Sequence, residues 1–96
     1  MEYNFEWDPD KARLNRQKHG VGFDQAVTVF RDPRAFSVFD DAHSRTEDRW
    51  VTLGILAGGG LLVVHHTFEE MNERTVRVRI FSSRKATKNE ANQYGA

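Results

Sequence analysis

The spacing of hydrophobic residues changes along the chain, and its first part predicts a strand followed by a helix. Aromatic and polar residues alternate from Tyr3 to Trp7, which predicts a short strand. Asp8 and Pro9 are typical of a helix start, because the first accepts hydrogen bonds from free amides and the second has no amide to satisfy. Gly20 is typical of a helix end. A helix over residues 9–19 is therefore predicted.

Two further helices are indicated by an apolar stripe and by a capping pattern. Apolar side chains recur at helical spacing after Gly22, which predicts a second helix over residues 23–31 before the breakers Asp32 and Pro33. Near the other end of the chain, TKNE has the spacing of a capping box, in which two side chains bond each other's backbone amides. This predicts a last helix over residues 88–94.

The remaining apolar runs predict strands, at residues 35–39, 49–57, 61–68 and 74–81. Glycines 58–60 separate two of these runs and predict a hairpin, whose three-residue loop would pair Leu53 with His65. The last run alternates strictly, so that one row of side chains faces the core and the other faces outward. The inward row is Val76, Val78 and Ile80, and the outward row is Arg77, Arg79 and Phe81.

Together these elements predict one α+β domain over residues 1–96, a small antiparallel sheet packed with two N-terminal helices and one C-terminal helix. With 39% hydrophobic and 29% charged residues, the chain is typical of a soluble globular protein. It has no apolar run of transmembrane length and no basic and apolar leader, so we expect it in the cytoplasm. The absence of cysteine excludes disulfides, thiol catalysis and iron–sulfur clusters.

The net charge of zero hides a gradient along the chain. Residues 1–48 carry ten acidic and seven basic side chains, whereas residues 49–96 carry four and seven. From Arg74 onward there are six basic residues and a single acidic one, Glu90. Such a concentration favours an anionic partner. A charged face that serves only solubility is the alternative.

The histidine pair and the arginines are the candidate functional groups. His65 and His66 are neighbours on one strand and point to opposite faces, which argues against a shared metal ion. The predicted hairpin register places His65 in an apolar row and leaves His66 exposed as the candidate.

Arg77 and Arg79 lie on one strand face about 7 Å apart, a spacing close to that of successive phosphates. Arg84 and Lys85 are expected in the loop that enters the last helix, beside its anion-binding amino end. The alternative is that the arginines form ion pairs with glutamates of the 69–73 turn.

An ordered set of motifs runs along the chain: FEWDPDKARLNRQKHGVGF, FRDP, HS and EDRW within 43–50, HT at 66–67, and RIFSSRKATKNE through Tyr94. Taken together, and over nearly the whole chain, these motifs resemble the BrnT family of toxins. The resemblance implies a RelE-like fold, RNA cleavage without metal or cofactor, and neutralisation by a small BrnA-like antitoxin whose ribbon-helix-helix domain binds operator DNA. The chain departs from the family at Phe68, Glu69 and Glu70, where an arginine is usual, and at Ser83 within the SAR motif.

The resemblance and the residues together predict a metal-independent endoribonuclease. Its catalytic candidates are His66, Arg79, Arg84, Tyr94 and Glu47. Its RNA-binding candidates are Arg77, Arg79, Lys85, Lys88 and Arg49. A histidine suits proton transfer at neutral pH, arginines suit phosphate contacts, and Tyr94 or Glu47 would supply the second proton group. A non-catalytic nucleic-acid-binding module and a protein-interaction domain are the alternatives.

Overall fold

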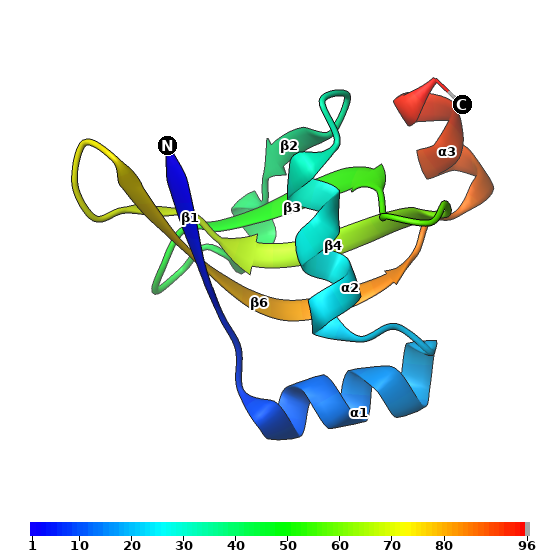
Figure 1. Ribbon diagram of the computed structural model, residues 1–96, viewed down its shortest axis with the longest axis horizontal. Helices are drawn as coiled ribbons and strands as arrows, with labels where there is room; N and C mark the ends of the chain where they lie inside the picture. The colour runs from blue at the N-terminus through cyan, green and yellow to red at the C-terminus, as the bar shows by residue number, and fades with distance from the viewer. Residues whose placement is uncertain (96) are drawn as a thin grey trace.

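The computed structural model describes residues 1–95 and contains one six-stranded sheet (Figure 1). The strands are β1 (Glu2–Glu6), β2 (Phe36–Phe39), β3 (Arg49–Ile55), β4 (Leu61–Thr67), β5 (Glu69–Glu70) and β6 (Thr75–Lys85). Their spatial order is β1, β6, β4, β3 and β2, and β5 pairs with β6. The predicted α+β class is confirmed. The expected all-antiparallel sheet is wrong at one pair, because β1 runs parallel to β6.

The helices lie on the two sides of this sheet and begin and end where their capping residues predict. They are α1 (Pro9–His19), α2 (Phe23–Val27), which continues as the 3₁₀ turn η1 (Thr28–Arg31), the 3₁₀ turn η2 (Asp41–His43), and α3 (Lys88–Tyr94). Asp8 accepts the first hydrogen bond of α1, and Gly20 closes it with a φ of 71°. In Figure 1, α1 lies below the sheet, α2 crosses in front of it, and α3 stands at the far end of β6.

The hydrophobic core has a part on each face of the sheet. The larger part joins α2 and η1 to β4 and β6, and its fully buried residues include Phe23, Ala26, Val29, Leu62, Val64, Val76, Val78 and Ile80. The smaller part, Leu53, Val63 and Tyr94, lies on the opposite face under α3. The predicted inward row of β6 is thereby confirmed.

The register of the β3–β4 hairpin differs from the prediction. Ile55 pairs with Leu61 and Val51 pairs with His65, so the predicted pairing of Leu53 with His65 is wrong. The connection covers residues 56–60, and the Leu56 amide bonds the Gly60 carbonyl at 3.0 Å, so the turn is centred on Gly58 rather than on Gly59. The three glycines inside it all have positive φ, which residues with a Cβ rarely adopt.

A β-bulge in β6 decides which side chains share a face. His65 pairs with Ser82, but His66 pairs with Ile80, which leaves Phe81 as an extra residue on β6. An extra residue reverses the alternation of the strand that contains it.

Because of the bulge, Arg84 lies on the same side of the sheet as Arg77 and Arg79, whereas Lys85 points to the side of α1 and α2. Both residues belong to β6, so the prediction that they lie in a loop is wrong. Arg77, Arg79, Ser82 and Arg84 together mark one face of the sheet, the arginine face. It lies opposite α2.

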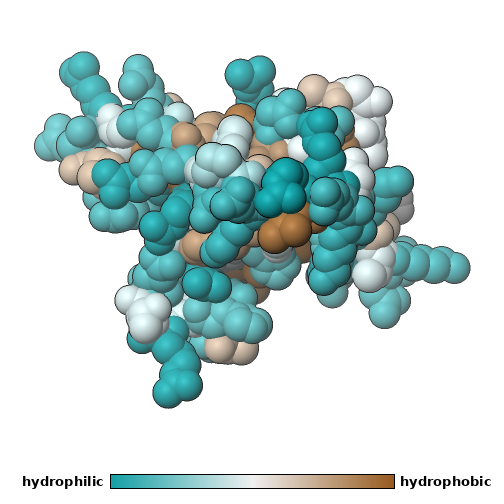
Figure 2. Space-filling model, turned by 90° about the horizontal axis from the view of Figure 1, so that it is seen from below, coloured by the Kyte–Doolittle hydropathy of each residue, from teal (hydrophilic) through white to brown (hydrophobic). Residues whose placement is uncertain are grey.

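The surface on the α1 side, seen from below the view of Figure 1, is mainly hydrophilic with small hydrophobic areas (Figure 2). Leu14 is an exposed apolar residue of α1. No helix within residues 1–95 combines the length and the apolar character needed to cross a membrane.

Candidate active site

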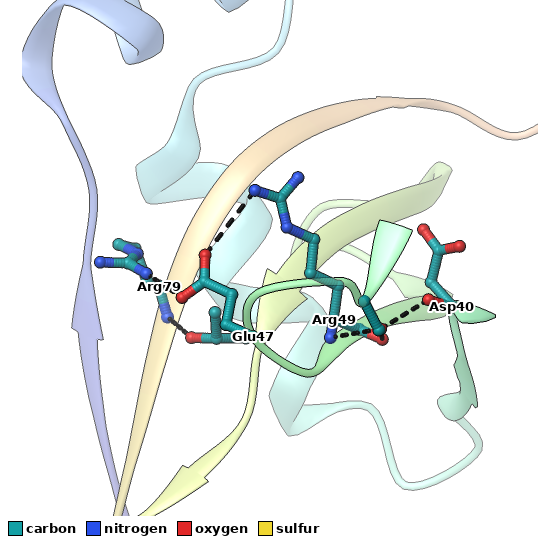
Figure 3. Close-up of polar contacts among 6 residues, drawn as sticks. Asp40, Glu47, Arg49 and Arg79 are labelled. Carbon is teal, nitrogen blue, oxygen red and sulfur yellow. Dashed lines mark hydrogen bonds and ion pairs between the residues drawn. The ribbon is translucent and has the colours of Figure 1, made fainter. Parts of the chain in front are cut away.

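Two arginines and one glutamate form an ion-pair cluster on the arginine face. The Glu47 carboxylate lies between Arg79, whose Nη2 is 2.5 Å from Oε2, and Arg49, whose Nη2 is 3.6 Å from Oε1 (Figure 3). Both guanidinium groups also lie over the Phe81 ring, with Cζ at 4.2 Å for Arg49 and 5.5 Å for Arg79. Phe81 is the bulged residue, so the bulge provides the apolar support for both cations.

The loop before β3 is tied to the sheet through Ser44. The Ser44 hydroxyl accepts a hydrogen bond from the Arg49 amide at 2.9 Å and donates to the Asp40 carbonyl at 2.6 Å. At the far side of the cluster, the Arg79 amide donates to Thr67 Oγ1 at 2.9 Å. The loop therefore brings Glu47 to a strand 32 residues further along the chain.

A polar pocket of about 240 Å³ opens beside this cluster, and its lining is Asp40, His43, Arg49, His65, Phe81 and Ser82. The Nδ1 atom of His43 lies 2.9 Å from the Asp40 carboxylate, which fixes the ring and leaves Nε2 without that contact. His65 is half-buried, and burial, reinforced by the nearby Arg84 charge, lowers its pKa. A neutral imidazole, a positioned second imidazole and a guanidinium thus line one pocket.

Arg84 lies on the arginine face, and its guanidinium is paired with Glu90 of α3. Its two terminal nitrogens contact the two Glu90 oxygens at 2.8 and 2.9 Å. The hydrogen bonds from Arg84 are the main reason why the pKa of Glu90 falls to about 2. Glu90 also accepts the Thr87 amide at 2.8 Å in the predicted capping box. Arg84 therefore provides a cation at the edge of the pocket while it orients the helix start.

Tyr94 anchors α3 to the sheet. It is 7% exposed, and its hydroxyl donates to the Asp32 carboxylate. Hydrogen bonds from the Ile55 amide and then from Tyr94 lower the pKa of Asp32. Tyr94 packs on Leu53 and Val63, four residues along β3 and β4 from the Arg49–Thr67 pair, a separation of about 13 Å. The structure does not bring Tyr94 together with Glu47.

His66 is buried, so the predicted exposure of this side chain is wrong. It is 1% exposed and faces α2 and η1, with its ring 4.9 Å from the Phe30 ring. Nδ1 lies 2.7 Å from the Thr67 carbonyl and Nε2 lies 2.6 Å from Thr52 Oγ1. Burial lowers the pKa of His66 to about 4. Both ring nitrogens are engaged in structural contacts, and His65 is the histidine that faces the pocket.

The other predicted RNA-binding residues are dispersed. Arg77 lies on the arginine face and pairs with Glu6 at 3.5 Å and Glu69 at 3.8 Å, which confirms the ion-pair alternative for this residue. Lys85 is exposed on the opposite side, so it does not belong with the arginines. Lys88 is exposed at the first position of α3.

Two pocket residues, Asp40 and His43, are not among the sequence candidates, and a third, His65, is predicted to lie in the core. The motif HS within 43–50 marks His43, but only the folded loop places it beside His65. The prediction for His65 follows from its place in an apolar row, but the hairpin pattern does not show which strand face is more open. Within residues 1–95, no three His, Asp or Glu side chains are grouped so as to hold a metal ion.

Comparison with known proteins identifies the family. Residues 7–90 match the family described as the ribonuclease toxin BrnT of type II toxin-antitoxin systems. The chain belongs to the BrnT family. Its BrnT fold also matches the crystal structure of the Brucella abortus ribonuclease toxin BrnT, with a TM-score of 0.62 and 21% sequence identity over 92% of this chain and 100% of that chain. No curated protein matches the sequence.

Proposed function

We propose that this BrnT-family chain is a toxin that cleaves RNA in the polar pocket of the arginine face. The observation that carries the proposal is the meeting of two histidines and Arg49 in one pocket, with Arg79 over the Phe81 ring that lines it and Arg84 close enough to His65 to lower its pKa. Proton-transfer groups and cations are the two kinds of group that phosphodiester cleavage requires. The family name gives the same activity independently.

The reaction we propose uses the RNA as its own nucleophile. A base removes the proton from a ribose 2′-hydroxyl, and the oxygen attacks the adjacent phosphorus. The bond from phosphorus to the 5′-oxygen breaks, and an acid protonates that oxygen. The products are a 2′,3′-cyclic phosphate and a 5′-hydroxyl end. Because the nucleophile belongs to the substrate, no metal ion is needed to generate it.

We propose a role for each group of the pocket. His65 is the proposed base, because its lowered pKa keeps the imidazole neutral at pH 7. His43, whose Nδ1 contacts Asp40, is the proposed acid. Arg49 and Arg79 stabilise the charge that develops on the phosphate oxygens, since a guanidinium fork matches phosphate geometry.

We further propose that a BrnA-like ribbon-helix-helix antitoxin neutralises the chain in the cytoplasm and alone contacts operator DNA. Membership of a type II toxin-antitoxin family supports an antitoxin partner. An antitoxin that covers the arginine face would exclude RNA, so that inhibition is competition for one surface.

The decisive experiment is RNA cleavage by the purified chain in the presence of a chelator. We expect 2′,3′-cyclic phosphate ends and a loss of about 10²-fold or more in rate for His65→Gln. His19→Gln is the matched control, since His19 lies at the end of α1 and does not line the pocket. Retention of RNA on a gel without any cleavage would instead support a nucleic-acid-binding module. Equal rates for both variants would remove His65 from the mechanism.

A further inference from the structure

We infer that Glu47 occupies a phosphate site, and that a substrate phosphodiester must displace its carboxylate from Arg49 and Arg79. The inference rests on the proposed function, because it concerns how RNA gains access to the same arginines. Glu47 is then an internal competitor that sets the affinity for RNA, rather than a proton-transfer group.

The first observation is that the protein uses only a small part of the hydrogen-bonding capacity of the two arginines. A guanidinium has five N–H donors. Arg79 donates to Glu47 from one of its nitrogens, and the nearest Arg49 nitrogen is 3.6 Å from the same carboxylate. The Nε atoms of both arginines are buried and have no hydrogen-bond partner. The pair is therefore under-satisfied by the chain itself.

The second observation is that the cations and the carboxylate are held by different kinds of contact. Arg49 and Arg79 extend from strands and lie over the Phe81 ring, so their positions do not depend on the loop. Glu47 extends from the loop between η2 and β3, and its side chain is 34% exposed. Its neighbours Thr46 and Asp48 are exposed too. The carboxylate can leave without opening the core.

The third point is the chemical similarity between the Glu47 carboxylate and the phosphodiester that would replace it. A carboxylate and a phosphodiester both carry one negative charge, and both offer two oxygens to a pair of cations. The phosphodiester is tetrahedral, so its oxygens are not confined to one plane and can accept from both guanidinium groups at once. Replacing the carboxylate by the phosphodiester thus fills donors that Glu47 leaves empty, which makes the exchange favourable once RNA is held elsewhere.

Binding of a fully 2′-O-methylated RNA oligonucleotide tests the inference, because this probe has no 2′-hydroxyl to attack. By fluorescence anisotropy at fixed salt, we expect Glu47→Gln to bind about fivefold tighter than wild type, the upper range for a partly exposed ion pair. Asp48→Asn is the matched control for net charge, since Asp48 is an exposed neighbour outside the ion pairs of residues 1–95. We expect less than about a twofold change there.

Two additional variants keep the test sharp. Glu47→Asp retains the charge and withdraws the carboxylate by one carbon, so it should tighten binding without altering net charge. Adding Arg49→Ala to Glu47→Gln should abolish the gain. The inference is overturned if Glu47→Gln and Glu47→Asp both bind like wild type, or if Asp48→Asn gains as much as Glu47→Gln.

The outcome is separable from that of the proposed function. Cleavage is measured on unmodified RNA, whereas the displacement is measured on a probe that cannot be cleaved. A wild-type chain that fails to cut RNA, together with a Glu47→Gln variant that binds more tightly, would refute the proposed RNA cleavage and support Glu47 as a competitor of phosphate. A chain that cuts RNA, but whose Glu47 variants do not bind the probe more tightly, would support the proposed cleavage and refute Glu47 as a competitor of phosphate.

Discussion

Replacing the buried His66 by glutamine should make the stability of the protein less sensitive to acid. The Thr67 carbonyl can only accept, so Nδ1 of the neutral ring carries the proton and Nε2 accepts from the Thr52 hydroxyl. Glutamine offers the same pair of functions, one donor and one acceptor, without a group that titrates near neutral pH. The substitution therefore removes the titration while it keeps the polar contacts.

The size of the effect follows from the difference between the folded and unfolded pKa values of His66. Burial lowers the folded pKa to about 4, whereas an unfolded histidine has a pKa of about 6.5. Because the folded pKa is depressed, the neutral ring is favoured in the folded state. Its contribution is complete above about pH 6.5 and is lost as the pH falls toward 4. At pH 4.5 the loss amounts to about 2–3 kcal/mol.

Urea denaturation at pH 7 and pH 4.5 measures this quantity. We expect the unfolding free energy of wild type to fall by about 2–3 kcal/mol more than that of His66→Gln between the two pH values. Groups that titrate equally in both proteins cancel in this comparison. Parallel pH profiles for the two proteins, or an NMR titration of the His66 ring above pH 6, would refute the burial argument.

Three further outcomes are expected. Arg79→Lys should reduce RNA cleavage by about 10²-fold while binding of the 2′-O-methylated probe changes far less, because the planar fork matters most in the transition state; parallel losses in both assays would contradict this. Tyr94→Phe should lower the unfolding free energy by about 1–2 kcal/mol through loss of the hydrogen bond to Asp32, with cleavage retained; a thermal melt together with the cleavage assay decides it. Arg77→Glu should weaken antitoxin binding more than Arg13→Glu on α1 does, and equal losses in a titration would move the antitoxin away from the arginine face.

The elements whose signals are local could be predicted from the sequence. The first helix starts and ends at its predicted residues, because Asp8 and Gly20 act through backbone contacts only a few residues away. The capping box of α3 is another such signal. The inward row of β6 up to Ile80 followed from simple alternation.

The parts of the candidate site that depend on long-range pairing could not be predicted. In β4 both faces are covered, so its apolar residues form a continuous run that does not tell His65 from His66. The partner of Arg79 also lies far away in sequence, in a loop whose polar residues give no signal of where they dock. The exposed histidine was therefore assigned to the wrong position, although the arginines were correctly placed outward.

The single extra residue at Phe81 also constrains how this site can be altered or transferred. If β6 paired with β4 without interruption, with Phe81 opposite His65, every later side chain of the strand would exchange faces. Arg84 would then turn toward the side of α2 and lose Glu90, while Ser83 would take its place opposite Val63. An engineer who regularised this strand for stability would erase the site without touching any of its polar groups. The number of residues between the arginines is therefore as necessary for the site as their charges are, because it decides whether they share a face.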